Sequence, residues 1–294
     1  MINSIDWKIL RFVDKLESHF MNLINSIITE TFGSLFLIVL LMLIYWVINK
    51  EKGKHLAFSF SISMCFNNFL KGLIKRKRPF EIDPDIRKLS LSQDGASGTS
   101  FPSGHSMNSA SIYSGIFYIA NDKKRIILKI LLVFMILLIG FTRIYLGVHY
   151  PSDVICGILF GIIITIPLMI LQDKLPKIKK YLYLITVLIF LPCLFFNTFG
   201  RDFVKAYGML VGFYFGDLFE RRIVKFNDIK TLKNKIIRIA IGFAIVGTTY
   251  LIYTIVPDTI HNNIVFTFFM HILVMFNGIF TAPLIFSKIE KRKK

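Results

Sequence analysis

Cysteine and acidic residues are both scarce in this chain of 294 residues. The three cysteines, Cys65, Cys156 and Cys193, are far apart in sequence, and each lies in an apolar stretch. They support neither a disulfide framework nor a thiolate metal site, so we expect three small buried side chains. The 18 Asp and Glu residues are outnumbered by 36 Lys and Arg residues, which gives a formal net charge of +18. Such a charge suits nucleic acid or a membrane surface, and its distribution along the chain decides between them.

Long apolar runs dominate the sequence, which is 54% hydrophobic and contains 30 phenylalanines. Runs of about 18 apolar residues with few charges are typical of helices that span a bilayer. We count nine, at 31–49, 56–74, 105–120, 126–146, 151–171, 181–197, 203–219, 237–255 and 263–286. A soluble protein could not bury so many runs, so we predict an all-α, polytopic membrane helical bundle of about nine spans. The third run is short and rich in Ser and Asn, and should face protein rather than lipid.

Residues 1–30 have a different pattern, in which apolar residues recur at helical spacing with charged residues between them. The apolar set is Trp7, Ile9, Leu10, Phe12, Val13, Leu16, Phe20, Leu23 and Ile24. We predict an N-terminal amphipathic helix that lies in the membrane interface. The pattern fits neither a span nor a cleavable signal peptide, which would need a charge-free apolar stretch.

The basic residues gather in alternate connections between the predicted spans. One side contains 50–55, 121–129, 172–180, 220–238 and 287–294, and these segments hold most of the Lys and Arg residues. By the positive-inside rule this side is cytoplasmic, with the N-terminus outside and the C-terminus inside. The positive charge is therefore mostly a topology signal, and we expect the bilayer rather than nucleic acid as partner.

One outward connection, 71–104, is strongly basic and so departs from this rule. Lys71, Lys75 and Arg78 are spaced to share one face if the second span continues as a helix, and Pro79 would end it. A snorkelling interfacial anchor is the alternative interpretation.

The same connection ends in Phe-Pro-Ser-Gly-His at 101–105, directly before the third run. A helix that begins here leaves first-turn backbone N–H groups unpaired, and these can bind an anion together with the Ser103 hydroxyl. His105 would then lie at the outward membrane boundary.

A third polar group surrounds the start of the fifth run. The fourth run ends in Thr142-Arg143, and His149 and Asp153 follow, four residues apart. The carboxylate can reach the imidazole if this turn is helical, and Pro151 suits a first helical turn. An ordinary capping pair without chemistry is the alternative.

Alternation of the spans brings all three groups to the outward surface, which suggests one site for a tetrahedral oxyanion. Cations, a hydroxyl and free amides stabilise phosphate oxygens. His149, oriented by Asp153, suits a nucleophile that forms phosphohistidine, and His105 suits the acid that protonates the leaving group. The outward side lacks the paired carboxylates of two-metal phosphatases, so we expect no metal and no other cofactor.

These motifs resemble the tripartite signature of the type 2 phosphatidic acid phosphatase family, which includes related haloperoxidases and sugar phosphatases. They are Lys71-x6-Arg78-Pro79, then Pro102-Ser103-Gly104-His105, then Arg143-x5-His149-x3-Asp153. The resemblance implies a metal-free helical bundle with Lys71, Arg78, Ser103, Gly104 and Arg143 on the phosphate. It also implies His105 as acid and His149 as nucleophile with Asp153 behind it. The family usually has Ser before the arginine of the third motif, where this chain has Thr142.

The resemblance divides the chain into three predicted parts: the interfacial helix at 1–30, a catalytic membrane core at 31–200, and further spans of unknown role at 201–294. A closely packed helix face is predicted in the last part by Gly208, Gly212 and Gly216. A shorter face of the same kind is predicted in the core by Gly157 and Gly161. Asp217 and His271 are either functional intramembrane groups or members of structural pairs.

We therefore predict an integral membrane phosphatase that hydrolyses a lipid phosphate or diphosphate. A protein that only binds or transports phosphorylated lipid is the alternative, as is vanadate-type oxidation by the same residues. Substrates left open are undecaprenyl diphosphate, phosphatidylglycerophosphate, phosphatidate and a sphingoid phosphate, with specificity expected in the 80–100 loop and between spans. The Ile, Lys, Asn and Phe bias suggests a bacterial plasma membrane and a cell-envelope lipid. The oligomeric state is left open.

Overall fold

A computed structural model describes residues 4–83, 85–86, 98–196 and 198–291, and the regular secondary structure among these residues is helical, with no strand. The chain divides into two compact units. Unit 1 comprises Met1–Ile38 and Phe66–Leu168, and unit 2 comprises Val39–Cys65 and Met169–Lys294. The all-α prediction is confirmed, whereas the functional division at residue 200 stays a prediction.

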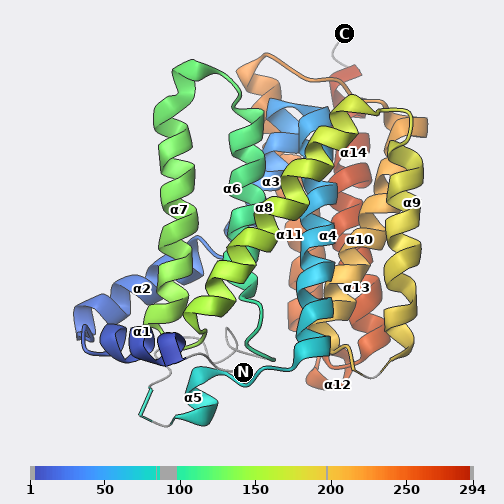
Figure 1. The fold of residues 1–294 in the computed structure, drawn as a ribbon. Coiled ribbons are helices and arrows are strands. Elements are labelled where there is room, and N and C mark those ends of the chain that lie inside the picture. The colour runs from blue at the N-terminus through green and yellow to red at the C-terminus, as the bar shows by residue number, and fades with distance from the viewer. Residues whose placement is uncertain (1–3, 84, 87–97, 197, 292–294) are drawn as a thin grey trace. The chain divides into compact units, whose positions relative to one another are not determined.

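Unit 1 contains the three motifs. Its helices are α1 (Ser4–Asp14), α2 (His19–Thr31), the start of α3 (Ser34–Leu43), the end of α4 (Lys50–Ile74), α5 (Pro79–Ile82), α6 (Gly104–Ile119), the 3-10 turn η3 (Lys123–Arg125), α7 (Ile126–Tyr145) and most of α8 (Pro151–Lys174). Helices α1 and α2 pack against α7 (Figure 1). The motif residues lie at the ends of α4, α6, α7 and α8 or in the segments that join them.

The N-terminal segment forms two helices rather than the predicted single one. Helix α1 ends at Asp14, and α2 begins at His19 after Ser18, whose hydroxyl accepts a hydrogen bond from the Met21 N–H at 3.2 Å. This local N-cap outweighs the continuous apolar periodicity. Helix α1 buries Asp6, Leu10 and Val13 on its inner face. Its position in the membrane interface stays a prediction.

Helix α6 faces protein, as its small polar residues predicted, and it packs closely against α8. Every residue of α6 from Ser106 to Gly115 is buried. A Cβ atom on Gly157 would lie 2.7 Å from the Ser103 carbonyl oxygen, and one on Gly161 would lie 2.5 Å from that of Met107. Larger side chains at these two glycines would push α6 away, so the predicted small-residue contact is present in unit 1.

Unit 2 contains the remaining helices. They are the end of α3, the π-turn η1 (Ile44–Ile48), the start of α4, the end of α8, α9 (Lys179–Phe190), the 3-10 turn η4 (Leu191–Phe195), α10 (Arg201–Phe219), the π-turn η5 (Glu220–Val224), α11 (Leu232–Ile255), α12 (Asp258–His261), α13 (Ile264–Phe276), the π-turn η6 (Asn277–Thr281) and α14 (Ala282–Lys291). The glycine face of α10 packs on α13 and η6. A Cβ on Gly208 would lie 2.8 Å from the Phe268 carbonyl oxygen.

Asp217 and His271 both have structural partners within unit 2. Asp217 is buried and forms ion pairs with Lys54 at 3.3 Å and Arg221 at 2.8 Å. His271 Nδ1 lies 2.7 Å from the Thr267 carbonyl oxygen, one turn earlier in the same helix. These contacts favour the structural interpretation of both residues.

Five helical segments among the described residues are long and apolar enough to cross a membrane. They are His19–Ile48, Ile126–Tyr145, Pro151–Lys174, Leu232–Ile255 and Ile264–Lys291. A polytopic helical membrane protein is thereby supported, and the count of nine spans stays a prediction.

Candidate active site

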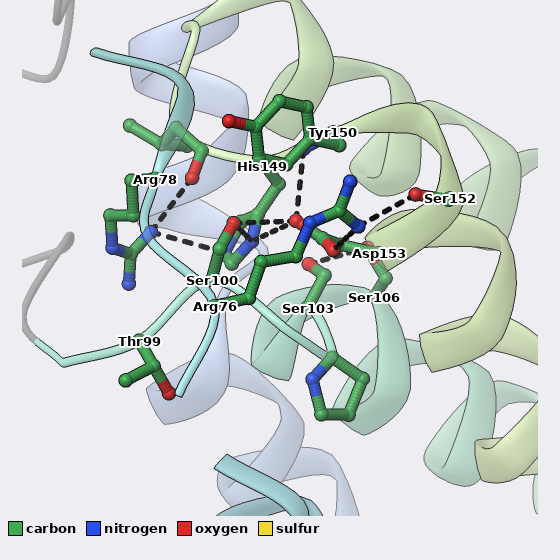
Figure 2. A network of polar contacts seen from close by, with 12 residues as sticks. Arg76, Arg78, Thr99, Ser100, Ser103, Ser106, His149, Tyr150, Ser152 and Asp153 are labelled. Atoms are coloured by element: carbon green, nitrogen blue, oxygen red, sulfur yellow. Dashed lines mark hydrogen bonds and ion pairs between the residues drawn. The ribbon is translucent and has the colours of Figure 1, made fainter. Parts of the chain in front are cut away.

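His149 lies in the short connection between α7 and α8, where Gly147 adopts a left-handed conformation with φ of 66°. The His149 backbone N–H donates to the Arg143 carbonyl oxygen at 3.3 Å, and only 2% of the residue is exposed. The turn therefore holds the imidazole inside unit 1, surrounded by polar side chains from three other segments (Figure 2).

Asp153 approaches His149 less directly than its spacing predicts. The His149 Nδ1 atom lies 3.6 Å from Asp153 Oδ2, which is longer than a hydrogen bond. The Ser100 hydroxyl donates to the same Oδ2 at 2.5 Å and lies 3.4 Å from Nδ1. Ser100 thus connects the carboxylate to the imidazole. Sequence reasoning missed it because nothing in the spacing distinguishes this serine from its neighbours.

Arg76 is a second residue that sequence reasoning missed. Its Nη1 donates to Asp153 Oδ1 at 2.6 Å and to Ser152 Oγ at 2.8 Å. The predicted shared helix face of Lys71, Lys75 and Arg78 is wrong, because α4 ends at Ile74 and Lys75 is left-handed with φ of 47°. The turn redirects the chain, and Arg76, which is not one of the three residues of that predicted face, reaches Asp153.

Arg78 lies directly beside the imidazole. Its Nη1 lies 3.3 Å from His149 Nε2 and donates to the Val148 carbonyl oxygen at 2.8 Å. A guanidinium has only donors, so the Nε2 atom that faces it is the unprotonated nitrogen and Nδ1 carries the proton. The Arg78 Nε donates to the Gly98 carbonyl oxygen at 2.9 Å, and Lys71 donates to that of Thr99. The 98–100 segment therefore connects both cations of the first motif.

Arg143 is held from the N-terminal helices. It is 1% exposed in the last turn of α7, and its Nη1 donates to the Thr29 hydroxyl of α2 at 2.8 Å. The Thr142 hydroxyl donates to the Ile139 carbonyl oxygen at 2.8 Å. The same hydroxyl lies 3.3 Å from the Thr29 hydroxyl of α2, so its contacts are with its own helix and with α2, and they do not support a phosphate contact for Thr142.

Ser103, Gly104 and His105 begin α6. The Ser103 N–H donates to the Asp153 backbone carbonyl at 3.1 Å, and its hydroxyl accepts from Ser106 at 2.9 Å. Ser103 is fully buried, whereas His105 is partly exposed. A Cβ atom on Gly33 would lie 3.5 Å from the His105 ring, so the start of α3 lies against this imidazole. Arg87 and Lys88, also in this basic connection, lie outside the described residues.

Burial is the main cause that holds the pKa of His149 well below its usual value, and the positive charges of Arg78, Lys71 and Arg143 add to it. Both effects disfavour the imidazolium. His149 is therefore neutral at neutral pH, which is the form that a nucleophile requires.

The fold and the site together define a class of protein: an all-α membrane protein in which a buried, neutral histidine lies among cationic side chains. The sequence matches the PAP2 superfamily over residues 52–177 and the transmembrane extension of PAP2 superfamily phosphatases over residues 204–294. The chain belongs to the PAP2 superfamily and is an integral membrane phosphatase of that superfamily. The resemblance drawn from the three motifs is thereby confirmed.

Two relatives and one solved structure illustrate the similarity. The chain is 27% identical to phosphatidylglycerophosphatase B of Bacillus subtilis, over 61% of this chain and 89% of that protein. It is 31% identical to lipid A 4'-phosphatase of Bacteroides thetaiotaomicron, over 54% of this chain and 73% of that protein. A crystal structure of a PAP2-type phosphatidylglycerolphosphate phosphatase from Bacillus subtilis superposes with a TM-score of 0.50 and 25% identity, covering 60% of this chain and 88% of that one.

Proposed function

We propose that this phosphatase hydrolyses a lipid phosphate or diphosphate through a phosphohistidine intermediate on His149, without a metal. The observation that carries the proposal is the environment of the imidazole. Its Nε2 faces the Arg78 guanidinium at 3.3 Å, and its Nδ1 faces Ser100 and Asp153. Nε2 thus lies where a guanidinium would stabilise phosphate oxygens. Nδ1 lies where a carboxylate would stabilise a positive charge on the imidazole.

In the first step, His149 Nε2 attacks phosphorus in line with the leaving oxygen. Lys71, Arg78 and Arg143 stabilise the charge on the equatorial oxygens, with Ser103 and Gly104 at the α6 N-terminus. Asp153 and Ser100 hold the Nδ1 proton and stabilise the phosphohistidine cation. His105 protonates the leaving oxygen, so this oxygen departs as a hydroxyl group rather than as an oxyanion. In the second step, His105 removes a proton from water, which attacks the phosphohistidine and releases phosphate and free His149.

The relatives support a lipid substrate, because their names specify phosphatidylglycerophosphate and lipid A. Both are phosphorylated amphiphiles, and a membrane enzyme meets such substrates in the bilayer. We place undecaprenyl diphosphate, phosphatidate and sphingoid phosphate with phosphatidylglycerophosphate as candidate substrates. Binding or transport without hydrolysis would need the cations but not the neutral His149, Asp153 and His105 together.

We further propose that the active site faces outward from a bacterial plasma membrane, with the C-terminus in the cytoplasm. The distribution of basic residues supports this orientation. The proposal includes nine spans, an interfacial N-terminal segment at 1–30, and residues 31–200 as the catalytic core.

The test is phosphate release from these four lipids in detergent, with excess EDTA present. We expect hydrolysis of at least one lipid, unchanged by EDTA, and its loss in His149→Ala. His19→Ala is the matched control, because His19 is exposed at the start of α2. Loss of activity on chelation that magnesium or zinc restores would contradict the metal-free mechanism. Full activity of His149→Ala would contradict the nucleophile.

A further inference from the structure

The N-terminal helix α1 contributes one buried carboxylate, Asp6, to the surroundings of the site. Asp6 is 4% exposed on the inner face of α1. Its Oδ2 accepts from Arg76 Nη2 at 2.8 Å and from Ser152 Oγ at 2.7 Å, and its Oδ1 accepts from the Ser152 N–H at 3.0 Å. Burying a carboxylate is costly unless donors surround it, and Asp6 has three.

Arg76 joins this carboxylate to that of Asp153. Its Nη1 donates to Asp153 Oδ1 at 2.6 Å, and its guanidinium lies 4.0 Å from the centre of the Tyr150 ring. In Figure 2 the guanidinium lies between Asp153 and Ser152. The planar fork of an arginine fixes the directions of its N–H groups, so holding Nη2 on Asp6 also sets the direction of Nη1.

Because Arg76 binds Oδ1 of Asp153, the other carboxylate oxygen, Oδ2, faces Ser100 and His149. Asp153 Oδ2 accepts from Ser100 Oγ at 2.5 Å and from the Tyr150 N–H at 3.0 Å, and it is the oxygen nearest His149 Nδ1. Rotation of the carboxylate would exchange these roles and move Ser100 relative to the imidazole.

We propose that Asp6 and Arg76 are positioning residues for Asp153, so that α1 contributes one polar side chain, Asp6, to the orientation of that carboxylate. The proposal rests on the proposed function of His149 and deepens it. Asp6 also binds the first turn of α8 through Ser152, next to Asp153. It therefore holds both the side chain that orients Asp153 and the backbone that carries it.

Apolar packing of α1 is separate from this polar contact and supplies a comparison. Leu10 is 2% exposed and packs with Ile86 and Tyr150. Truncation of Leu10 weakens the attachment of α1 without removing a donor or acceptor. Asp14 lies on the same helix and is exposed.

The decisive variant is Asp6→Asn in the full chain, compared with Asp14→Asn and Leu10→Ala, on the lipid phosphate that the wild type hydrolyses. The asparagine amide has one acceptor oxygen, so its NH₂ group must face Arg76 or the Ser152 N–H, both of which are donors. We expect kcat to fall roughly ten- to a hundredfold with KM nearly unchanged, because the phosphate-binding cations are intact. Asp14→Asn should match the wild type.

Leu10→Ala separates positioning from simple loss of stability. It should lower the melting temperature but leave kcat close to wild type at temperatures where the protein is folded. A double-mutant cycle adds a second readout: Asp6→Asn should have little further effect in an Arg76→Gln background, because both act through Asp153. Additive losses, or equal kcat losses in Asp6→Asn and Leu10→Ala at equal stability, would overturn the positioning role.

The outcomes also distinguish this inference from the proposed function. An active wild type whose Asp6→Asn variant behaves like Asp14→Asn would overturn the role of Asp6 alone. A wild type that forms no phosphohistidine and hydrolyses none of the lipids would overturn both.

Discussion

Ser100→Ala removes the hydroxyl that connects Asp153 to His149 and leaves both of those residues in place. In the native site, Ser100 Oγ lies 2.5 Å from Asp153 Oδ2 and 3.4 Å from His149 Nδ1. Without it, Asp153 Oδ2 keeps the Tyr150 N–H at 3.0 Å, and the imidazole lies 3.6 Å away. The carboxylate therefore still stabilises the imidazolium by charge but loses its hydrogen-bonded connection.

The size of the effect follows from this geometry. A hydrogen bond to an ionised group contributes about 1.5–3 kcal/mol. Since about 1.4 kcal/mol corresponds to tenfold in rate, full use of this bond in the transition state predicts a loss of roughly ten- to a hundredfold in kcat. Asp153→Asn should cost more, about 10⁴-fold by analogy with the serine-protease triad, because it also disturbs the tautomer and removes the charge.

The assay is steady-state phosphate release, with Ser109→Ala as the matched control. Ser109 is a buried serine of α6 whose hydroxyl donates back to the Ser106 carbonyl oxygen of its own helix at 3.0 Å. We expect activity to rank as wild type and Ser109→Ala, then Ser100→Ala, then Asp153→Asn. A Ser100→Ala enzyme within twofold of wild type, beside a strongly impaired Asp153→Asn, would refute the connecting role of Ser100.

Three further predictions test the chemistry and the topology. His149→Ala should lose roughly 10³-fold or more of the phosphatase activity on any substrate. His105→Ala should lose much more activity on a lipid monophosphate than on an activated aryl phosphate, because the phenolate leaving group needs little protonation. Equal losses of activity on both substrates, without trapped phosphohistidine, would contradict the role of His105 as acid. Because the lowered pKa of His149 keeps the imidazole neutral, the acid limb of the pH profile of kcat/KM should lie below the usual histidine pKa of about 6.5. The limb should move to higher pH in Arg78→Gln, which removes a positive charge beside His149, and stay in place in Arg78→Lys, which keeps that charge. An unmoved limb in Arg78→Gln would contradict the assignment of this limb to His149. In intact cells, Asp85→Cys should react with an impermeant thiol reagent and Lys230→Cys should not, and the reverse result would refute the orientation.

Much of the helical framework was predictable because apolar runs are local signals. The runs at 126–146 and 151–171 correspond to α7 and α8 within a few residues at each end. A closely packed face on α8 was also legible from Gly157 and Gly161, which leave room for another backbone, whereas its partner helix α6 was not. The three motifs identified the family from residue types and spacing alone.

The tertiary structure decided how those residues are connected. Helical periodicity assigned Lys75 and Arg78 to one face, but a left-handed Lys75 ends that periodicity and directs Arg76 to Asp153. Asp6 and Ser152 are 146 positions apart, and no pattern along the chain relates them. Hydropathy and motif spacing are properties of a segment by itself. Hydrogen bonds between distant side chains depend on turns and on how helices pack, which is why the surroundings of Asp153 emerged only from the folded chain.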